Sequence, residues 1–578
     1  MNIYAIEFNK KAEQLKNAFL NGRSFEELEA EIAPCLCIEG LFAAFVAVCD
    51  RRERARVFRC AAPTLKEAWH GACRSATRFI SGKDYNACWV KADIMRCSEH
   101  KSTESVIKEF SRGYNEMYRR GISFDDELLT ALTEAEINGN RVLTYKKKTI
   151  ELAQVNKYLS VACETKLNDL PDTLVLFDCI SYFSDDNSVV HELYNEGLNC
   201  GRRINGEFDK ETALEVITTS SEYLTMQLDL DGKFDYGYYP IYHKLIPNYN
   251  ILRHASTIWS LVCAYRITGD KYTLHQIECA LGYLVKNSFY KYKRPRDEEN
   301  TAYIAELATR EVKLGANAVA IIMMTEYMDV TGSDKYVKLC KELGNGILEL
   351  FDSDTGEFFH VLNIPDLSRK EKIRTVYYDG EAVFALSRLY ALTKEQRWLE
   401  AAKTAVDRFI REDYTRHRDH WVAYSVNELT KYAPEERYFE FGLKNADLNL
   451  KKIHDQPTTY HTYLELLCVT FELYDRIVEN NIKVAYLSEF RLEEFIKTLF
   501  HRADFMLNGY CYPEYVMYLR YPYKIQGAFF VRHDGYRIRI DDIQHFCGAY
   551  YSLYRNYEKL DSLRRSFSVT EDEIKVRS

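Results

Sequence analysis

The sequence lacks the features that mark membrane proteins and nucleic-acid-binding proteins. No apolar run of 18 residues occurs among its 578 residues, and the N-terminus has no long hydrophobic signal-peptide core. Basic residues are not in excess, since 77 Lys and Arg stand against 86 Asp and Glu, a formal net charge of −9. We therefore expect no membrane span and no nucleic-acid partner, and we predict a cytoplasmic protein.

Motifs for phosphates and metals are also missing. The stretch SGKD at 81–84 lacks the earlier glycine that a Walker A motif needs. Sixteen cysteines are scattered singly, which favours reduced and mostly buried thiols. Cys35 and Cys37 have no second pair at zinc-like spacing, and His417 and His420 have no third ligand nearby in the sequence. We expect no metal and no cofactor.

The chain divides into parts with different sequence patterns. Residues 1–165 alternate short apolar runs with helical spacing, which predicts a small α+β domain of unknown role. Residues 166–205 form a mixed connecting segment with turn residues. Residues 206–560 have helical periodicity throughout, and a polar C-terminal tail covers 561–578. The protein is therefore expected to be mainly α.

The long helical part is built from a repeated pattern. Its stretches YRITGDKYTLHQI, YMDVTGSDKYVKL and YALTKEQRWLEAA each join an apolar helix to an amphipathic one, and Thr268, Thr331 and Thr393 are 63 and 62 residues apart. Alternate helices are apolar all round, so six are expected inside six amphipathic partners, in an (α/α)6 toroid of six helical hairpins. Periodicity places the twelve helices at about 212–228, 250–268, 271–288, 314–332, 334–351, 380–393, 396–412, 419–432, 435–453, 457–478, 488–508 and 540–557.

The inner helices of such a toroid run the same way, so their N-terminal ends open on one face. Capping explains aspartates at these ends, but it does not explain four histidines and an arginine, because cations oppose the helix dipole there. Taken singly, each aspartate is typical of a cap and each histidine of a core or surface position. Together they predict a polar pocket. Its candidate residues are Asn250, Arg253, His254, Asn317, Arg374, Tyr377, Tyr378, Asp379, Glu381, Asp419, His420, Trp421, His461, Asp541, Asp542, Gln544 and His545.

Three loops that lead into inner helices carry glycine turns and alternating aromatic residues. They lie at 229–240, 353–366 and 529–540, and we predict that they form short hairpins around the mouth of the toroid. An aromatic wall above carboxylates suits a sugar. The aromatic residues expected to wall the cleft are Tyr236, Tyr238, Tyr239, Phe358, Phe359 and Tyr536.

With these hairpins, the TGD and TGSD turns and the loops DLDGKF and DSDTGEF, the segment from about 205 to 560 resembles the (α/α)6-toroid carbohydrate-active enzymes. That superfamily includes glycoside hydrolases, N-acylglucosamine 2-epimerase-like proteins, and uronate-acting lyases or epimerases. The resemblance implies an enzyme that acts on a small sugar or an oligosaccharide. None of these features is a specific catalytic motif, so no catalytic residue is carried over from the superfamily.

Glycoside hydrolysis is the leading hypothesis from the sequence. It needs one protonated carboxylic acid and one carboxylate on either side of the glycosidic bond. Arg253 offers a bidentate partner for an acidic substituent, which indicates a uronate-containing substrate. The candidate acids lie on the third, fourth and sixth inner helices: Asp379, Glu381, Asp419, Asp541 and Asp542.

Other functions stay open at this point. Sugar epimerases and polysaccharide lyases move protons with histidine or tyrosine. The four histidines of the pocket, His254 and His420 first among them, are candidates for such a role, together with Tyr249, Tyr377 and Tyr378. A non-catalytic glycan- or peptide-binding scaffold would instead fill the mouth with salt bridges. Zinc-dependent cyclase chemistry needs two cysteines and a histidine, of which Cys547 near His545 is only a fragment. Neither the sugar nor the oligomeric state follows from the sequence.

Overall fold

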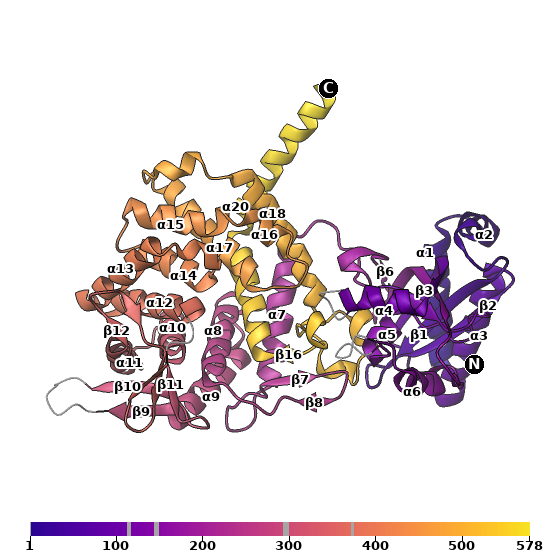
Figure 1. Ribbon diagram of the computed structural model, residues 1–578, viewed down its shortest axis with the longest axis horizontal. Helices are drawn as coiled ribbons and strands as arrows, with labels where there is room; N and C mark the ends of the chain where they lie inside the picture. The colour runs from indigo at the N-terminus through magenta and orange to yellow at the C-terminus, as the bar shows by residue number, and fades with distance from the viewer. Residues whose placement is uncertain (1, 113–116, 144–148, 293–299, 372–374, 578) are drawn as a thin grey trace. The chain divides into compact units, whose positions relative to one another are not determined.

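The structure is a computed structural model that describes residues 2–112, 117–143, 149–292, 300–371 and 375–577 (Figure 1). The chain forms two compact units. The N-terminal unit consists of Met1–Glu207, Tyr238–Lys244 and Asn508–Arg537, and the C-terminal unit of Phe208–Gly237, Leu245–Leu507 and Ile538–Ser578.

The N-terminal unit is built on an antiparallel sheet with strand order β2-β1-β3-β5-β4, and β6 pairs with β5. β1 is buried along its whole length because the sequence FAAFVAVC is apolar throughout. The sheet agrees with the expected α+β fold. Its strands are β1 (Phe42–Cys49), β2 (Arg56–Ala62), β3 (Trp89–Ser102), β4 (Gly121–Ser123), β5 (Thr173–Ser184) and β6 (Val190–Glu192).

Two apolar cores hold helices against this sheet. One core joins α1, α2 and α3 to β1 and β3, and the other joins α4, α5 and α6 to β4 and β5. The bounds are α1 (Ile3–Leu20), α2 (Phe25–Ile32), α3 (Leu65–Lys83), α4 (Thr103–Arg112), α5 (Glu134–Asn140) and α6 (Leu152–Ala162).

Residues 508–537 belong to the N-terminal unit, although the sequence pattern placed them within the toroid. The segment has turns, one short α-helix, α19 (Pro513–Val516), and two 3-10 helices of three residues, so no long apolar helix draws it into the ring. Polar contacts also link it to other parts of the N-terminal unit. Arg203 Nη2 donates to Glu514 Oε2 at 2.7 Å, and the Tyr515 hydroxyl donates to the carbonyl of Cys200 at 2.9 Å.

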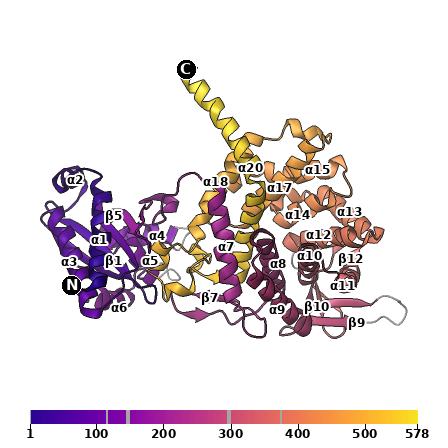
Figure 2. The ribbon, with the colours of Figure 1, turned by 180° about the vertical axis from the view of Figure 1, so that it is seen from behind.

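The C-terminal unit is an (α/α)6 toroid, which confirms the predicted fold. Six inner helices contact one another in sequence order, and the last contacts the first, so that the ring closes (Figures 1 and 2). The inner helices are α8 (Ile251–Thr268), α10 (Leu314–Thr331), α12 (Thr375–Thr393), α14 (His420–Leu429), α17 (Thr462–Glu479) and α20 (Ile540–Arg577). The outer helices are α7 (Lys210–Met226), α9 (Lys271–Ser288), α11 (Val337–Glu349), α13 (Gln396–Arg411), α15 (Glu436–Asp447), followed by the short α16 (Leu450–His454), and α18 (Leu492–Met506).

Side-chain composition determines which helices lie inside. On α10 nearly every residue from Leu314 to Met328 is buried, in keeping with its apolar sequence. On α13 one face is buried and the other carries charged residues, as on a surface helix. None of the described helices is both long and apolar enough to cross a membrane.

Short strands lie between the helices of the C-terminal unit. The predicted hairpin in 353–366 is present as β12 (Phe351–Asp352) and β13 (Glu357–Phe358). The loops 229–240 and 529–540 are divided between the two units. A sheet that the periodicity did not predict has the order β15-β14-β11-β10-β9. Its strands are β9 (Phe289–Tyr292), β10 (Thr301–Glu306), β11 (Glu311–Lys313), β14 (Val361–Asn363) and β15 (Arg369–Glu371).

The polar residues 561–577 continue α20 (Figure 1). No glycine or proline occurs after Gly548 to end the helix. Asp561 also accepts hydrogen bonds from Arg564 and Arg565, which lie three and four residues further along the helix.

Candidate active site

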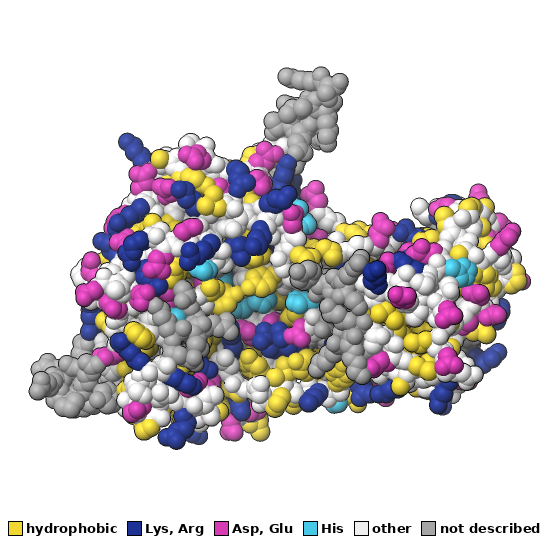
Figure 3. All heavy atoms as spheres, viewed as in Figure 1, with side chains coloured by type: hydrophobic (Ala, Val, Ile, Leu, Met, Phe, Trp, Pro, Cys, Tyr) yellow, Lys and Arg dark blue, Asp and Glu magenta, His cyan; other side chains and the backbone are white. Residues whose placement is uncertain are grey.

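Three histidines from three inner helices meet at the N-terminal ends of those helices. His420 begins α14, His461 directly precedes α17, and His545 lies in the second turn of α20. The His461 and His545 rings stack with centroids 4.7 Å apart, and the His420 ring meets that of His545 edge to face at 5.0 Å. On the face seen in Figure 3, histidines gather with basic and acidic side chains in one area of the C-terminal unit.

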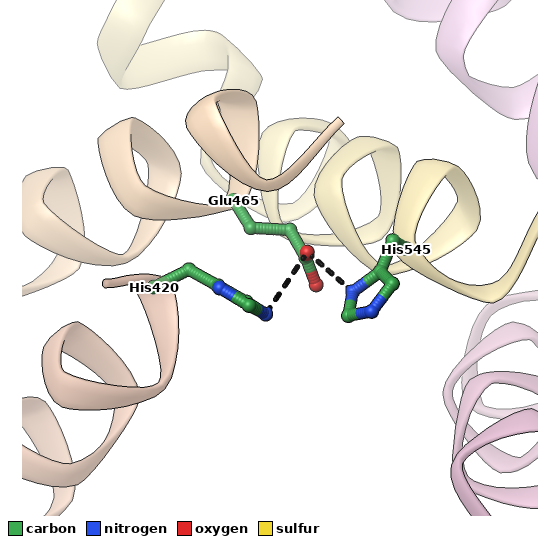
Figure 4. A group of neighbouring side chains, drawn as sticks. All are labelled: His420, Glu465 and His545. Atoms are coloured by element: carbon green, nitrogen blue, oxygen red, sulfur yellow. Dashed lines mark hydrogen bonds and ion pairs between the residues drawn. The ribbon is translucent and has the colours of Figure 1, made fainter. Parts of the chain in front are cut away.

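Glu465 of α17 lies between two of these histidines (Figure 4). Its Oε2 is 2.7 Å from Nδ1 of His545 and 3.7 Å from Nε2 of His420. Its Oε1 accepts a hydrogen bond from the Tyr424 hydroxyl at 3.3 Å. Glu465 is fully buried, and this desolvation raises its pKa well above the usual range.

The surroundings of His420 and His545 favour the neutral form of both imidazoles. His420 is only 1% exposed, and within the described part of the chain neither of its ring nitrogens has a hydrogen-bond partner. Burial lowers its pKa far below the ordinary value, and His461 and Arg253 add repulsion. Burial lowers the pKa of His545 in the same way. A neutral imidazole can accept a proton at neutral pH.

Two arginines neutralise the acids in the first turn of α20. Arg253 Nη1 lies 2.9 Å from Asp541 Oδ1. Arg539 makes a bidentate pair with Asp542, with N–O distances of 2.7 and 3.0 Å. Asp542 is also 3.6 Å from Nε2 of His461. Arg253 and Arg539 keep 20% and 25% of their side chains exposed, so the group is open to solvent on their side.

Asp419 holds the backbone at the entrance of α14 and α12. Its Oδ1 accepts from the Trp421 amide at 2.9 Å, as an N-cap does. Its Oδ2 accepts from the Tyr377 amide at 2.7 Å, where Tyr377 has φ 86°, a strained conformation for a residue with a side chain. Burial raises the pKa of Asp419 to about 7.

Asp379 faces outward, toward α13. Its Oδ1 is 2.9 Å from His360 Nε2, its Oδ2 accepts from the Tyr414 hydroxyl at 3.1 Å, and Arg408 Nη1 lies 3.5 Å away. All four side chains are buried. Asp379 therefore joins α12 to its outer helix.

Glu381, also on α12, is buried beside α10. A side chain at Gly315 would come within 2.1 Å of Glu381 Oε2, so that glycine makes room for the carboxyl group. Burial lowers the pKa of Arg253, but Asp541 and, after it, the Glu381 carboxylate raise this pKa above its ordinary value. Glu381 is thus an acid of the inner ring close to the arginine of the site.

Three predicted residues at the start of α8 and α10 are structural. His254 Nε2 donates to the Ala280 carbonyl of α9 at 2.9 Å, so its Nδ1 accepts from the Tyr249 hydroxyl at 2.6 Å. Asn250 caps α8 by accepting from the Leu252 amide. Asn317 accepts from the amide of Ile304 and donates to the carbonyl of Lys313.

The other predicted residues lie in different places. Tyr238 belongs to the N-terminal unit, where its hydroxyl lies 2.7 Å from His243 Nδ1. Trp421 is buried against Trp259, with ring centroids 5.6 Å apart. Tyr378 contacts His360 edge to face, and Arg374 lies outside the described residues.

Sequence reasoning placed Glu465 deeper on its helix than the residues of the mouth, and it gave neither Glu465 nor Tyr424 a role at the site. A signal was present, because each follows a predicted residue by four positions: Glu465 follows His461, and Tyr424 follows His420. Residues four apart share one face of a helix, so a polar residue at that spacing is expected to face the same pocket.

His420, Glu465 and His545 also form a set that could hold a metal ion. One ligand atom from each lies within 4.8 Å of the others, and all three residues are buried. Two imidazoles and a carboxylate are the ligand types of many zinc sites. The same geometry serves proton transfer, because the Glu465–His545 distance is that of a short hydrogen bond.

Comparisons with known proteins give no sequence match: no protein-family model and no curated protein matches this chain. Some solved structures are similar. A D-mannose isomerase aligns with 61% of this chain and 100% of its own, at 14% identity and a TM-score of 0.46. A cellobiose 2-epimerase from Bacillus thermoamylovorans aligns with 59% of this chain and 99% of its own, at 13% identity and a TM-score of 0.45. An α-mannanase from Bacteroides thetaiotaomicron aligns with 61% of this chain and 98% of its own, at 12% identity and a TM-score of 0.44. At such low sequence identities the similarity concerns the fold alone.

Proposed function

We propose that this chain is a carbohydrate-active enzyme that isomerises or epimerises a reducing sugar by proton transfer. The observation that carries the proposal is the pairing of two buried, neutral imidazoles, His420 and His545, at the N-terminal ends of the inner helices. Histidine is the usual group for proton transfer near neutral pH. Two such groups supply both a base and an acid.

The chemistry requires the open-chain sugar, whose carbonyl makes the neighbouring C–H bond acidic. One histidine takes the proton from that carbon, and the other gives a proton to the carbonyl oxygen, which yields an enediol. Return of the proton to the same carbon from the other side gives the epimer. Return to the former carbonyl carbon gives the isomeric sugar.

Arg253 favours a neutral sugar over a uronate. Its guanidinium is already paired with Asp541 at 2.9 Å and lies near Glu381, so little uncompensated positive charge is left for a sugar carboxylate. Part of the guanidinium remains exposed, and it can still donate hydrogen bonds to sugar hydroxyls. The proposed substrate is therefore a neutral sugar and not the uronate-containing substrate expected from the sequence.

Glycoside hydrolysis is the second candidate, favoured by the pKa of about 7 at Asp419, which suits a general acid. However, both carboxyl oxygens of Asp419 accept backbone amides. The two carboxyl oxygens of Asp379 form hydrogen bonds with His360 and Tyr414. Two of the acids proposed from the sequence, Asp379 and Asp419, thus have structural partners, whereas the His420 ring nitrogens make no hydrogen bond within the described residues, and this supports proton transfer over hydrolysis.

The test is NMR spectroscopy of sugars incubated with the protein in D2O. The panel holds D-mannose and cellobiose, the sugars named for two of the similar structures, together with an α-mannan oligosaccharide. We expect deuterium at a ring carbon and a new epimer or isomer, and neither change with the His420→Ala/His545→Ala double variant. New reducing ends without exchange would contradict the proposal and establish hydrolysis.

A further inference from the structure

A surface of the N-terminal unit, which the proposed reaction does not use, combines aromatic rings with cations. Three segments that are distant in the sequence form it, namely 50–55, 238–244 and 520–524, and all three belong to this unit. Backbone hydrogen bonds join them; for example, the Arg520 amide donates to the Pro240 carbonyl at 3.2 Å. We call it the aromatic–basic surface, and its residues are Arg54, His243, Arg520, Tyr521, Tyr523 and Lys524.

Three rings of this surface are held in a row. The Tyr238 hydroxyl lies 2.7 Å from His243 Nδ1, which fixes the imidazole. The His243 ring meets the Tyr521 ring edge to face, with centroids 4.4 Å apart, and Tyr521 meets Tyr523 in the same way at 6.4 Å. Tyr523 is 52% exposed, so the row ends at solvent. Because the rings are already packed, a ligand that stacks on them costs little conformational entropy.

The backbone is strained at the two residues where this row begins. His243 has φ 53° and Tyr521 has φ 51°, in the left-handed region that residues with a side chain rarely adopt. The two residues lie in different segments, and their rings contact each other. Strain of this kind is typical of sites where the backbone positions a functional side chain. The strained pair therefore indicates that the placement of the rings has a function.

The cations of the surface are not matched by acids in the described part of the chain. Among these residues, no ion pair joins Arg54, Arg520 or Lys524 to a carboxylate. Arg54 Nη2 donates to the Ile241 carbonyl at 2.6 Å, and its buried Nε has no hydrogen-bond partner within the same residues. Burial, followed by the nearby Arg520, lowers the pKa of Arg54 to about 10. Two neighbouring guanidinium groups that lack an acid favour an anionic ligand.

Lys524 places a further positive charge beside two of the rings. Its Nζ lies 5.5 Å from the ring centroid of Tyr521 and 5.9 Å from that of Tyr523. Lys524 and Arg520 are both exposed. Ring faces for C–H groups and cations for acidic groups thus occur side by side, as the recognition of an acidic sugar requires.

We propose that the aromatic–basic surface binds an acidic glycan, a chain of sugar rings that carry carboxylate groups. Tyr521 and Tyr523 stack on the C–H faces of the sugars. Arg54 and Arg520 pair with their carboxylates. Because these contacts lie on a surface, several sugar units have to bind together for a stable complex. The inference goes beyond the proposed function and does not rest on it, since the N-terminal unit holds the glycan whatever reaction the C-terminal unit performs.

A nucleic acid fits this surface less well than a glycan. Proteins that bind nucleic acids tightly neutralise about six to ten phosphates, whereas the surface is defined by three cations, Arg54, Arg520 and Lys524. The net charge of the chain, −9, also opposes a densely charged polymer. A glycan with carboxylates has a lower charge density, and its sugar rings gain from the stacking.

Affinity electrophoresis of the full chain tests the proposal, in native gels that contain polygalacturonate or, as the uncharged comparison, dextran. The variant is Tyr523→Ala/Arg520→Ala, and both side chains are exposed, so its melting temperature should equal that of the wild type. The matched control is Tyr272→Ala/Arg78→Ala, which removes an exposed tyrosine of α9 and an exposed arginine of α3. We expect polygalacturonate to retard the wild type and the control, and the Kd of Y523A/R520A to be about 10-fold higher.

Three results would overturn the proposal. The first is a wild type whose mobility polygalacturonate does not change, and the second is equal retardation of the wild type and Y523A/R520A. The third is retardation in a gel with polyuridylate as strong as with polygalacturonate, because the surface would then bind polyanions in general. None of the substituted residues belongs to the candidate active site, so this test and the deuterium-exchange test of the proposed function succeed or fail separately.

Discussion

Arg253 of α8 and Asp541 of α20 form an ion pair, 2.9 Å long, between the first and the last inner helix. The pair lies where the ring of helices closes, and both residues are mostly buried. It therefore links the stability of the toroid to the geometry of the site.

Replacement of Arg253 by Met should destabilise the protein. It leaves Arg539, 3.2 Å from Asp541 Oδ2, as the remaining partner of that carboxylate. We expect the loss to cost about 2 kcal/mol, because the Arg253–Asp541 pair is mostly buried but keeps some contact with water. Urea unfolding of the variant measures the change. The double variant R253M/D541L should recover most of the loss, since no buried charge is then left alone. A double variant as unstable as the single one would show that the pair does not act as a unit.

His420→Gln and His545→Gln should each lower kcat for exchange at carbon by 100-fold or more, roughly the contribution of a positioned acid or base. Because neither ring is expected to bind the sugar strongly, KM should change much less. His461 is the matched control, since it stacks on His545 but lies nearer to solvent. H461Q should retain more activity than either of the others. Equal losses at all three positions would contradict the assignment of roles.

His254→Leu should affect stability and its pH dependence, with kcat unchanged. The variant loses two buried hydrogen bonds, to Ala280 and Tyr249, which should cost about 2 kcal/mol at pH 7. In the wild type, burial lowers the pKa of His254 from 6.5 to about 4. The unfolded chain thus binds a proton between pH 6.5 and 4 that the folded protein does not bind.

The free energy of unfolding should therefore fall as the pH drops from 6.5 to 4, with the contribution of His254 fully present above that window. H254L removes this contribution. Urea titrations of both proteins at pH 7 and pH 5 give the comparison. The difference in stability between them should shrink at the lower pH, and a constant difference would show that His254 does not titrate as inferred.

Added Zn²⁺ should inhibit the exchange reaction. The ligand atoms of His420, Glu465 and His545 lie within 4.8 Å of one another, so a zinc ion can compete with the protons that these groups carry. EDTA should restore the activity of the inhibited protein and leave the untreated protein unchanged. Activation by zinc, or loss of activity in EDTA alone, would point to metal-assisted chemistry instead.

The toroid could be predicted from the sequence because helix periodicity and composition are local properties. The apolar stretch that forms α10 and the one-sided α13 differ in sequence as they differ in burial. The location of residues 508–537 could not be predicted in this way. Their place depends on partners such as Arg203 and Cys200, about 300 residues earlier in the chain.

The candidate residues could be placed at helix N-termini, but their roles could not be derived from the sequence. Arg253 and His254 are neighbours on α8, and successive residues in a helix point about 100° apart. One therefore pairs with Asp541 of α20, while the other bonds to Ala280 of α9. The sequence predicts at which end of a helix a residue lies. Whether its side chain points to the mouth or to an outer helix depends on how the neighbouring helices pack around it.

The closed ring of inner helices has a consequence for synthesis of the protein. Arg253 lies on the first inner helix and His545 on the last, nearly 300 residues later. A ribosome has therefore translated five of the six inner helices before the partner of Arg253 has been made. Partial chains released earlier would expose the apolar flanks of α8 and α17 that α20 covers in the complete ring, and would contain no assembled site.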